Sequence, residues 1–318
     1  MTDSTNANSG TGEYNSENRG NVDYDGFWKD LIERFCYQLL KRAVPELYEK
    51  ADISKKPSFL DKEFRDVINT ADHVSAYFAD MVSKISLLCG EIAWVIFHCE
   101  AQGPGGGNLS ERMNHYRCYI YAHYRREPVA LAIITGTRRK NERFYSHSHF
   151  GTEITYRYNN LVLAELDDEE LKASDNPVDL ALYAAKCALK ADKEEIQKYK
   201  YLRTLLSLLA ERGWSEEDKR DLLLFLERII NLKDRELEKQ YTEYRNQLTK
   251  EGKIVYIPLG ERELAREIEQ RGIEKGIEKG REEGREKKAL EVARSMLADG
   301  LSLETIRKYT GLDKKDIH

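Results

Sequence analysis

The chain has 318 residues, a length that suggests about two domains. Its 51 Lys and Arg against 56 Asp and Glu give a formal net charge of −5, and 41% hydrophobic with 34% charged residues suits a folded protein with a highly charged surface. No apolar run reaches the roughly 18 residues of a membrane-spanning helix, and the N-terminus shows no signal segment. These features exclude a membrane-spanning protein and lead us to expect a cytoplasmic location, with no membrane partner.

The cysteines and histidines give little sign of a metal centre. The cysteines are odd in number and lack paired spacings, which argues against a disulfide framework or a zinc site and predicts reduced, mostly buried thiols. His147 and His149 alternate along a predicted strand and so share a face. Two ligands do not make a metal site, so a solvated or hydrogen-bonded pair is the favoured interpretation over a metal site.

The first half of the chain predicts a small α/β domain. Residues 1–22 are rich in Ser, Asn and Gly and are expected to be disordered. Apolar residues at three- and four-residue spacing predict a helix from Phe27 to Leu47, limited by Pro45. Alternation predicts a strand over 74–88, with Asp80 on its polar face, and the apolar run Ile92–Cys99 predicts a strand covered on both faces.

The following segments continue this pattern. A glycine-rich loop at 103–107 lacks the Lys-Ser/Thr pair of a phosphate-binding loop and is expected to be a connector. Ser110 is predicted to cap a helix that ends before Pro128, followed by a strand at 129–135 and a β segment at 153–162. The order of helix, strand, strand, helix and strand predicts an α/β domain over residues 23–166.

Beyond residue 167 the pattern becomes helical. Four amphipathic helices are expected at 177–190, 193–212, 215–232 and 234–250, with Ser215 and Asp218 as a capping pair. We expect them to form a bundle over 167–250 that packs against the α/β core. Residues 251–318 are predicted to hold a charged Gly-repeat helix and short C-terminal helices.

The C-terminal segment contains two further motifs. Glycines recur every fourth residue from Gly272 to Gly284, which indicates either close approach of a partner helix, and hence a dimer, or a charged connector. The last eighteen residues resemble the first half of a helix-turn-helix, with Ser302 as cap, Ile306 buried and a turn at Thr310-Gly311. Because only six residues follow Leu312, we favour a packing module over a reader of DNA bases.

Basic residues are concentrated in the middle of the chain. Residues 101–160 hold nine Lys and Arg against four Asp and Glu, in a protein that is acidic overall. A basic face suits the phosphates of DNA, although such a charge count is also common on a solvated face. The candidate DNA-binding residues are Arg125, Arg126, Arg138, Arg139, Lys140 and Arg143.

Three residues carry the candidate chemistry: Asp80 on the first strand, and Glu100 and Gln102 where the central strand ends. A two-residue turn at Cys89-Gly90 would put Asp80 and Glu100 on opposite faces, whereas a three-residue loop Cys89-Gly90-Glu91 would place them directly opposite one another. A shared metal therefore requires an even register or a bulge. The alternative is that both carboxylates are structural and are satisfied by Arg or by backbone N–H groups.

The order of Asp80, about twenty residues, and Glu100-Ala-Gln102 resembles the PD-(D/E)XK nuclease core in the form found in the Rpn recombination-promoting nucleases, or putative transposases. Further motifs in the same order are similar to that family: Glu111-Arg112-Met113 with Tyr116, the SDNP of residues 174–177, the ERGWSEED of residues 211–218, the Glu-Lys-Gly repeats and the MLADGLSLETIRKYTGL ending. The resemblance covers nearly everything after residue 22.

The resemblance implies a restriction-endonuclease-like core with a C-terminal helical region and a metal-dependent DNA endonuclease activity, with Asp80 and Glu100 as Mg²⁺ ligands and Gln102 as the third catalytic residue. In that family Gln commonly replaces the usual Lys of the third position. An amide supplies hydrogen bonds but no positive charge. The alternative is therefore a catalytically weak or inactive protein that keeps the nuclease fold and binds DNA or oligomerises.

Overall fold

The computed structural model describes residues 24–60, 78–100, 109–135, 143–257 and 288–312. The chain forms two compact units, Met1–Tyr256 and Ile257–His318. The expected disordered tail at 1–22, the glycine-rich loop at 103–107 and the Gly repeat at 272–284 all lie outside the described residues.

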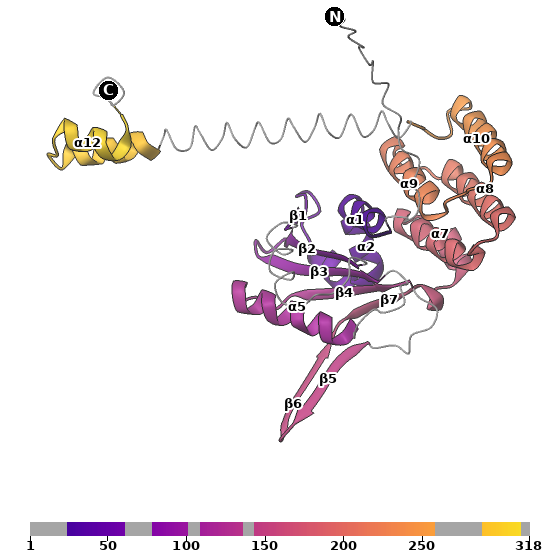
Figure 1. The fold of residues 1–318 in the computed structure, drawn as a ribbon, viewed down its shortest axis with the longest axis horizontal. Helices are drawn as coiled ribbons and strands as arrows, with labels where there is room; N and C mark the ends of the chain where they lie inside the picture. Colours follow the sequence, from indigo (N-terminus) through magenta and orange to yellow (C-terminus); the bar gives the residue numbers. More distant parts are fainter. Residues whose placement is uncertain (1–23, 61–77, 101–108, 136–142, 258–287, 313–318) are drawn as a thin grey trace, which may run out of the picture. The chain divides into compact units, whose positions relative to one another are not determined.

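The first unit is a mixed α/β fold built on a five-stranded sheet (Figure 1), which confirms the α/β class. The strand order is β1-β2-β3-β4-β7; β1, β2 and β3 are antiparallel neighbours, and β3, β4 and β7 run parallel. The strands of the sheet are β1 (Ser58–Phe59), β2 (Phe78–Ser86), β3 (Ile92–Glu100), β4 (Val129–Ile134) and β7 (Asn159–Val162). All of them except β1 correspond to predicted β segments.

Helices cover both faces of this sheet (Figure 1). The helices of the unit are α1 (Tyr24–Arg34), α2 (Cys36–Ala43), α3 (Pro45–Lys50), α5 (Leu109–Tyr124), α6 (Asp168–Ala173), α7 (Pro177–Ala191), α8 (Glu195–Glu211), α9 (Glu216–Ile229) and α10 (Arg235–Lys250), with a 3-10 turn at η1 (Leu163–Glu165). On one face, Val95 and Phe97 belong to a large core with α1, α2 and α7; on the other, Trp94 and Ile96 pack under α5. The prediction that the central strand is covered on both faces is confirmed.

The prediction of one helix from Phe27 to Leu47 is wrong. Phe35, at φ −115° and ψ 31°, separates α1 from α2, and Val44, at φ −142° and ψ 62°, separates α2 from α3. Pro45 begins α3 instead of ending the previous helix, because the missing N–H of proline is not needed at a first helical position. Apolar spacing alone did not reveal these breaks, since the same face stays buried across both of them.

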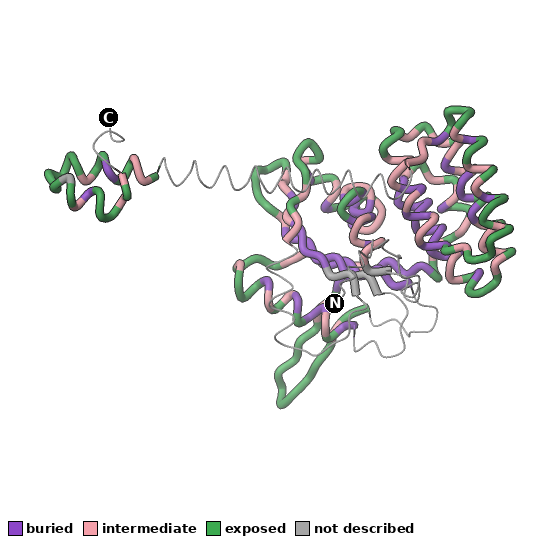
Figure 2. Tube along the Cα trace, turned by 45° about the horizontal axis from the view of Figure 1, so that its top comes forward, coloured by how far each residue is buried: buried purple, intermediate pink, exposed green. Residues whose placement is uncertain are grey.

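The helical second half of the unit follows the prediction closely. The Asn176 side chain accepts a hydrogen bond from the Val178 N–H, Ser215 accepts one from the Asp218 N–H, and Asp234 caps α10, so these side chains define the helix starts. The short helix α6 was not predicted. Residues of α7 to α10 share one continuous hydrophobic core with α1, α2 and the sheet (Figure 2).

Three smaller expectations need correction. The predicted β segment 153–162 is two strands in different sheets: β6 (Thr152–Arg157) pairs with β5 (Phe144–His149) in a separate hairpin, and β7 joins the main sheet. Ser110 lies inside α5, which begins at Leu109. Of the four cysteines with described side chains, all are free, but Cys89 and Cys118 are exposed.

The second unit is described from residue 288 to residue 312. Residues 288–298 are helical and are followed by a turn at Gly300, with φ +79°, and by α12 (Leu303–Thr310). Ser302 accepts a hydrogen bond from the Thr305 N–H, Ile306 is buried against Ala293, and Gly311 ends α12 in the left-handed conformation. The predicted cap, buried residue and turn are confirmed.

Candidate functional site

The register of the β2–β3 hairpin decides how the candidate carboxylates are placed. Position 80 lies directly opposite His98, and Glu100 lies directly opposite Phe78. Directly opposed residues share a face and so do residues two apart along a strand, which puts positions 80, 98 and 100 on one face. The even register that a shared metal site requires is therefore present, with positions 80 and 100 as diagonal neighbours.

The turn that sets this register differs from both predicted alternatives. The Leu87 N–H donates to the Glu91 carbonyl at 2.8 Å, so the loop is Leu88-Cys89-Gly90. Gly90 has φ +87°, the left-handed conformation that ends such three-residue loops. The expected three-residue loop thus occurs, but one residue earlier, and this shifts the partner of Asp80 from Glu100 to His98.

The face that holds position 80 is not the polar face that the sequence suggested. Val82, on that face, is buried beneath α5 with Trp94 and Ile96. The neighbouring Lys84 places its ammonium 4.6 Å from the centre of the Trp94 ring, so it covers apolar surface while its charge stays near solvent. Because Lys84 lies on this face, the alternation of polar and apolar residues along β2 wrongly predicted that the face is exposed.

His98 is the residue of this site that the sequence analysis missed. It is fully buried, and its ring centre lies 6.3 Å from that of Tyr116 on α5. Met113 and Tyr116, from the motif Glu111-Arg112-Met113 with Tyr116, are buried on the sheet-facing side of α5. That motif therefore seats α5 on β3 next to His98. The available signal was the spacing of two residues between His98 and Glu100.

The structure describes the backbone at Asp80 and Glu100, and Gln102 lies outside the described residues. The antiparallel pairing places the start of β2 beside the end of β3. Glu100 also pairs with Ile134 at the end of β4. Three strand ends thus meet at one edge of the sheet. Within the residues whose side chains are described, no group of three His, Cys, Asp or Glu side chains forms a metal cluster.

The structure describes three of the six candidate DNA-binding residues, Arg125, Arg126 and Arg143. Arg125 and Arg126 are exposed and follow the last turn of α5, which is 16 residues and so about 24 Å long, and they precede the start of β4. They therefore lie at the edge of the sheet opposite to Glu100. Arg143 forms an ion pair with Glu165. Residues 138–140 follow the end of β4 beside Glu100 but lie outside the described residues.

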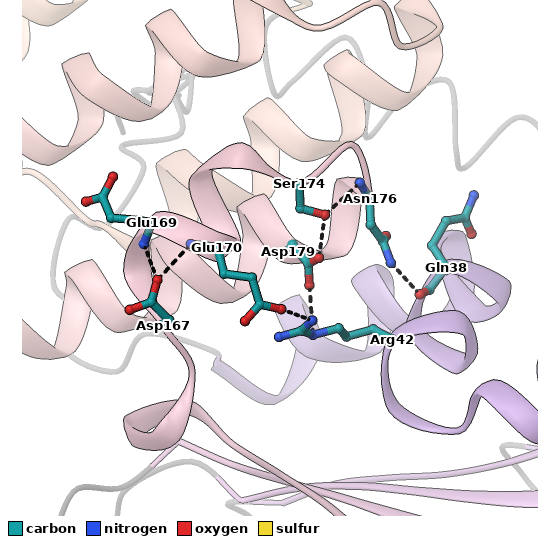
Figure 3. A network of polar contacts seen from close by, with 8 residues as sticks. All are labelled: Gln38, Arg42, Asp167, Glu169, Glu170, Ser174, Asn176 and Asp179. Carbon is teal, nitrogen blue, oxygen red and sulfur yellow. Dashed lines mark hydrogen bonds and ion pairs between the residues drawn. The ribbon is translucent and has the colours of Figure 1, made fainter.

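The SDNP and ERGW motifs contact one another. The Trp214 indole N–H donates to the Asp175 carbonyl at 2.8 Å, and the Arg212 guanidinium lies 3.3 Å from the Asp175 carboxylate. Asn176 caps α7 and also donates to the Gln38 carbonyl of α2 at 2.9 Å (Figure 3). These two motifs therefore join the helical half of the unit to the helices that cover the sheet.

A buried carboxylate lies at the centre of this junction. The Asp179 side chain, 5% exposed, accepts a hydrogen bond from the Ser174 hydroxyl at 2.6 Å and lies 3.3 Å from the Arg42 guanidinium, which also binds Glu170 (Figure 3). Burial raises the pKa of Asp179, while Ser174 and Arg42 act in the opposite direction. The network has a structural role, since all its members are engaged with one another.

Residues 286–318 match the sequence model described as the Rpn/YhgA-like nuclease family, C-terminal HTH domain. The resemblance to the Rpn family is confirmed for these residues. The matched Rpn segment includes the helical residues 288–298, α12 and the turn between them, so it is more than the first half of a helix-turn-helix. No curated protein and no solved structure matches the chain.

The function that can be stated for the chain rests on the match of residues 286–318. The chain carries an HTH domain of a nuclease family, which indicates nuclease-type function and DNA binding. In the part of the chain that the structure describes, no helix has the length and apolar character needed to cross a membrane.

Proposed function

We propose that this protein is a metal-dependent DNA endonuclease with a PD-(D/E)XK core, in which Asp80 and Glu100 hold Mg²⁺. The observation that carries the proposal is the even register of β2 and β3, which puts both positions on one face at one edge of the sheet. Diagonal neighbours on adjacent strands lie about 7–8 Å apart, a separation across which two carboxylates can reach one ion.

The residues at this edge suit a magnesium ion. Mg²⁺ prefers oxygen ligands and is usually bound through one or two carboxylates, with water and phosphate oxygens completing its shell. Asp80 and Glu100 would supply the two carboxylates. When bound, the ion acidifies a water molecule and neutralises charge on the phosphate.

The protein residues around these carboxylates would have distinct roles. Asp80 and Glu100 would hold the metal ion in place. Gln102 would position water or a phosphate oxygen by hydrogen bonds from its amide. His98, buried between the two carboxylate positions and α5, would act as a positioning residue that fixes the end of β3. The buried apolar side chains on this face would limit the access of bulk water to the metal site; they are Val82, Ile96 and Met113.

DNA binding would involve more than the nuclease core. The candidate contacts to phosphates are the C-terminal HTH domain and Arg138, Arg139 and Lys140. These three residues come after β4 in the chain, and β4 ends level with Glu100. Arg125 and Arg126, which lie at the opposite edge of the sheet, and Arg143, which is paired with Glu165, are weaker candidates. A dimer formed through the Gly repeat and a cytoplasmic location remain proposals.

A plasmid-nicking assay across a Mg²⁺ titration tests the proposal. Wild type is expected to convert supercoiled to open-circular DNA only with the metal, and Asp80→Asn and Glu100→Gln each to lower the rate at least about 100-fold. Glu91→Gln, which changes an exposed glutamate at the opposite end of the same hairpin, should nick like wild type. Nicking that persists in both site variants contradicts the proposal, and DNA binding without nicking by wild type supports the alternative of an inactive DNA-binding protein.

A further inference from the structure

The β5–β6 hairpin is an arm that projects away from the main sheet (Figure 1). Only the base of the arm contacts α5, where the Arg117 guanidinium lies 5.4 Å from the centre of the Tyr156 ring. Beyond that contact almost every residue of both strands is exposed (Figure 2). A two-stranded ribbon is only marginally stable alone, so an arm of this kind contributes little to the stability of the folded protein.

One face of the arm carries a row of rings. Tyr145, His147 and His149 alternate along β5, with centroids 6.4 Å and then 6.1 Å apart, and the first two rings are within 15° of parallel. The Phe150 ring follows at 4.1 Å from His149. The two separations along β5 are close to two base steps of a nucleic-acid strand, each step being about 3.4 Å.

At the tip of the arm, an aromatic residue is exposed to solvent in a backbone conformation that is unfavourable for bulky residues. Phe150 and Gly151 have φ values of +47° and +81°, as in a type I′ hairpin turn, where Asn or Gly is preferred at both positions. A bulky residue is uncommon there. The Phe150 side chain is nevertheless 95% exposed, so its ring contributes almost no apolar burial to the folded state.

The charge distribution on the arm favours a nucleic acid as the partner. The ring face is formed by Tyr145, His147, His149, Thr152, Ile154 and Tyr156, and it carries no carboxylate. The one acidic residue of the two strands, Glu153, lies opposite Ser148 on the other face. Of the two arginines at the base of the arm, Arg143 is paired with Glu165 and Arg157 lies over the Phe144 ring on the other face, so binding to the ring face would depend mainly on stacking.

We propose that this arm binds unpaired nucleotides, whose bases stack on His147, His149 and Phe150. The inference rests on the proposed function, which makes DNA the substrate, and it narrows that substrate to DNA with single-stranded, frayed or junction character. Bases stack on aromatic rings whatever their sequence, so the arm would select for unpaired structure and not for a sequence.

Fluorescence anisotropy with the full-length chain tests this inference. The probes are a short labelled DNA strand and the matched duplex, in EDTA so that binding is measured without hydrolysis. The variant His147→Thr/His149→Thr/Phe150→Asn removes the rings with residues that suit strands and left-handed turns. The control Ser146→Thr/Ser148→Thr changes the opposite face of the same strand.

We expect the ring variant to bind the single strand at least about tenfold more weakly than wild type, the duplex within about twofold, and the control to match wild type on both probes. An unchanged single-strand affinity, an equal loss on both probes, or a wild type that does not bind the strand overturns the inference. So does a change in solution mass on ring removal, which would make a second copy the partner. If only this inference fails, metal-dependent nicking and its loss in Asp80→Asn remain.

Discussion

Asp80 lies directly opposite His98 in the ladder between β2 and β3, and this pairing places Glu100 diagonally across from Asp80 on the same face. A shift of the pairing by one residue would put the two carboxylates on opposite faces of the sheet. The proposed metal site thus depends on the three-residue loop Leu88-Cys89-Gly90, which lies at the far end of the hairpin from the site.

The register can be tested by cross-linking at accessible positions. Ser86 lies directly opposite Ile92, and opposed residues are about 4.5–5.5 Å apart at Cα, within the range of a disulfide. In a Cys89→Ser background, Ser86→Cys/Ile92→Cys should oxidise to a disulfide, as measured by mass after thiol alkylation. Ser86→Cys/Ala93→Cys should not, because these residues face opposite sides. The reverse pattern would show an odd register.

Sequence reasoning predicted the central strands of the sheet, but it left the register of the hairpin open and did not predict the contacts that surround the site. Both β2 and β3 were identified because Met81, Ile85 and the run from Trp94 to Phe97 are strongly apolar. The burial of Val82 on this face could not be predicted, because the neighbouring Lys84 looks like a solvent-facing residue until its side chain is seen against the Trp94 ring. His98 was missed since a buried histidine looks like any other residue of an apolar strand.

The junction between the two halves of the first unit should depend on Arg42. Arg42→Met leaves the carboxylate of Asp179 buried without its cation, and should lower the free energy of unfolding by about 3 kcal/mol in urea denaturation. Asp179→Asn removes the charge while Ser174 can still donate to the amide oxygen, so the double variant should lose less than the sum of the single losses. Strictly additive losses would show that the two residues are not coupled.

Asp168 should make the stability of the protein fall in acid. Hydrogen bonds from Lys186, at 2.7 Å, and from Lys190 lower the pKa of Asp168. Because the folded pKa lies below the unfolded value of about 3.9, the stabilisation is complete above that value and is lost as the pH falls through the folded pKa. Asp168→Asn should therefore be less stable than wild type at pH 7, with a difference that shrinks below about pH 4.

Urea denaturation across this pH range measures that difference. Glu169→Gln is the matched control, since Glu169 is 81% exposed and pairs with Lys172 on the surface, and it should change the stability by less than about 0.5 kcal/mol. A stability difference for Asp168→Asn that is the same at pH 3 and pH 7 would exclude this carboxylate as a source of acid sensitivity.

DNA affinity should depend on Arg138, Arg139 and Lys140, which come after β4 in the chain. Each phosphate contact adds about 0.9 to the steepness of the fall of log affinity with log salt. Arg138→Gln/Arg139→Gln/Lys140→Gln should therefore reduce this steepness by up to about 2.7. Arg125→Gln/Arg126→Gln, at the opposite edge of the sheet, should leave it nearly unchanged. Equal slopes for wild type and the triple variant would exclude residues 138–140 as phosphate contacts.

Direct metal binding tests the central claim, that Asp80 and Glu100 together hold a divalent cation. Calorimetric titration of the full chain with Mn²⁺, a hard cation that binds to similar oxygen ligands, should show saturable binding by wild type and by Glu91→Gln. Asp80→Asn and Glu100→Gln should each weaken this binding at least about tenfold. Equal Mn²⁺ binding by wild type and both site variants would contradict the claim, whatever nuclease activity the protein shows.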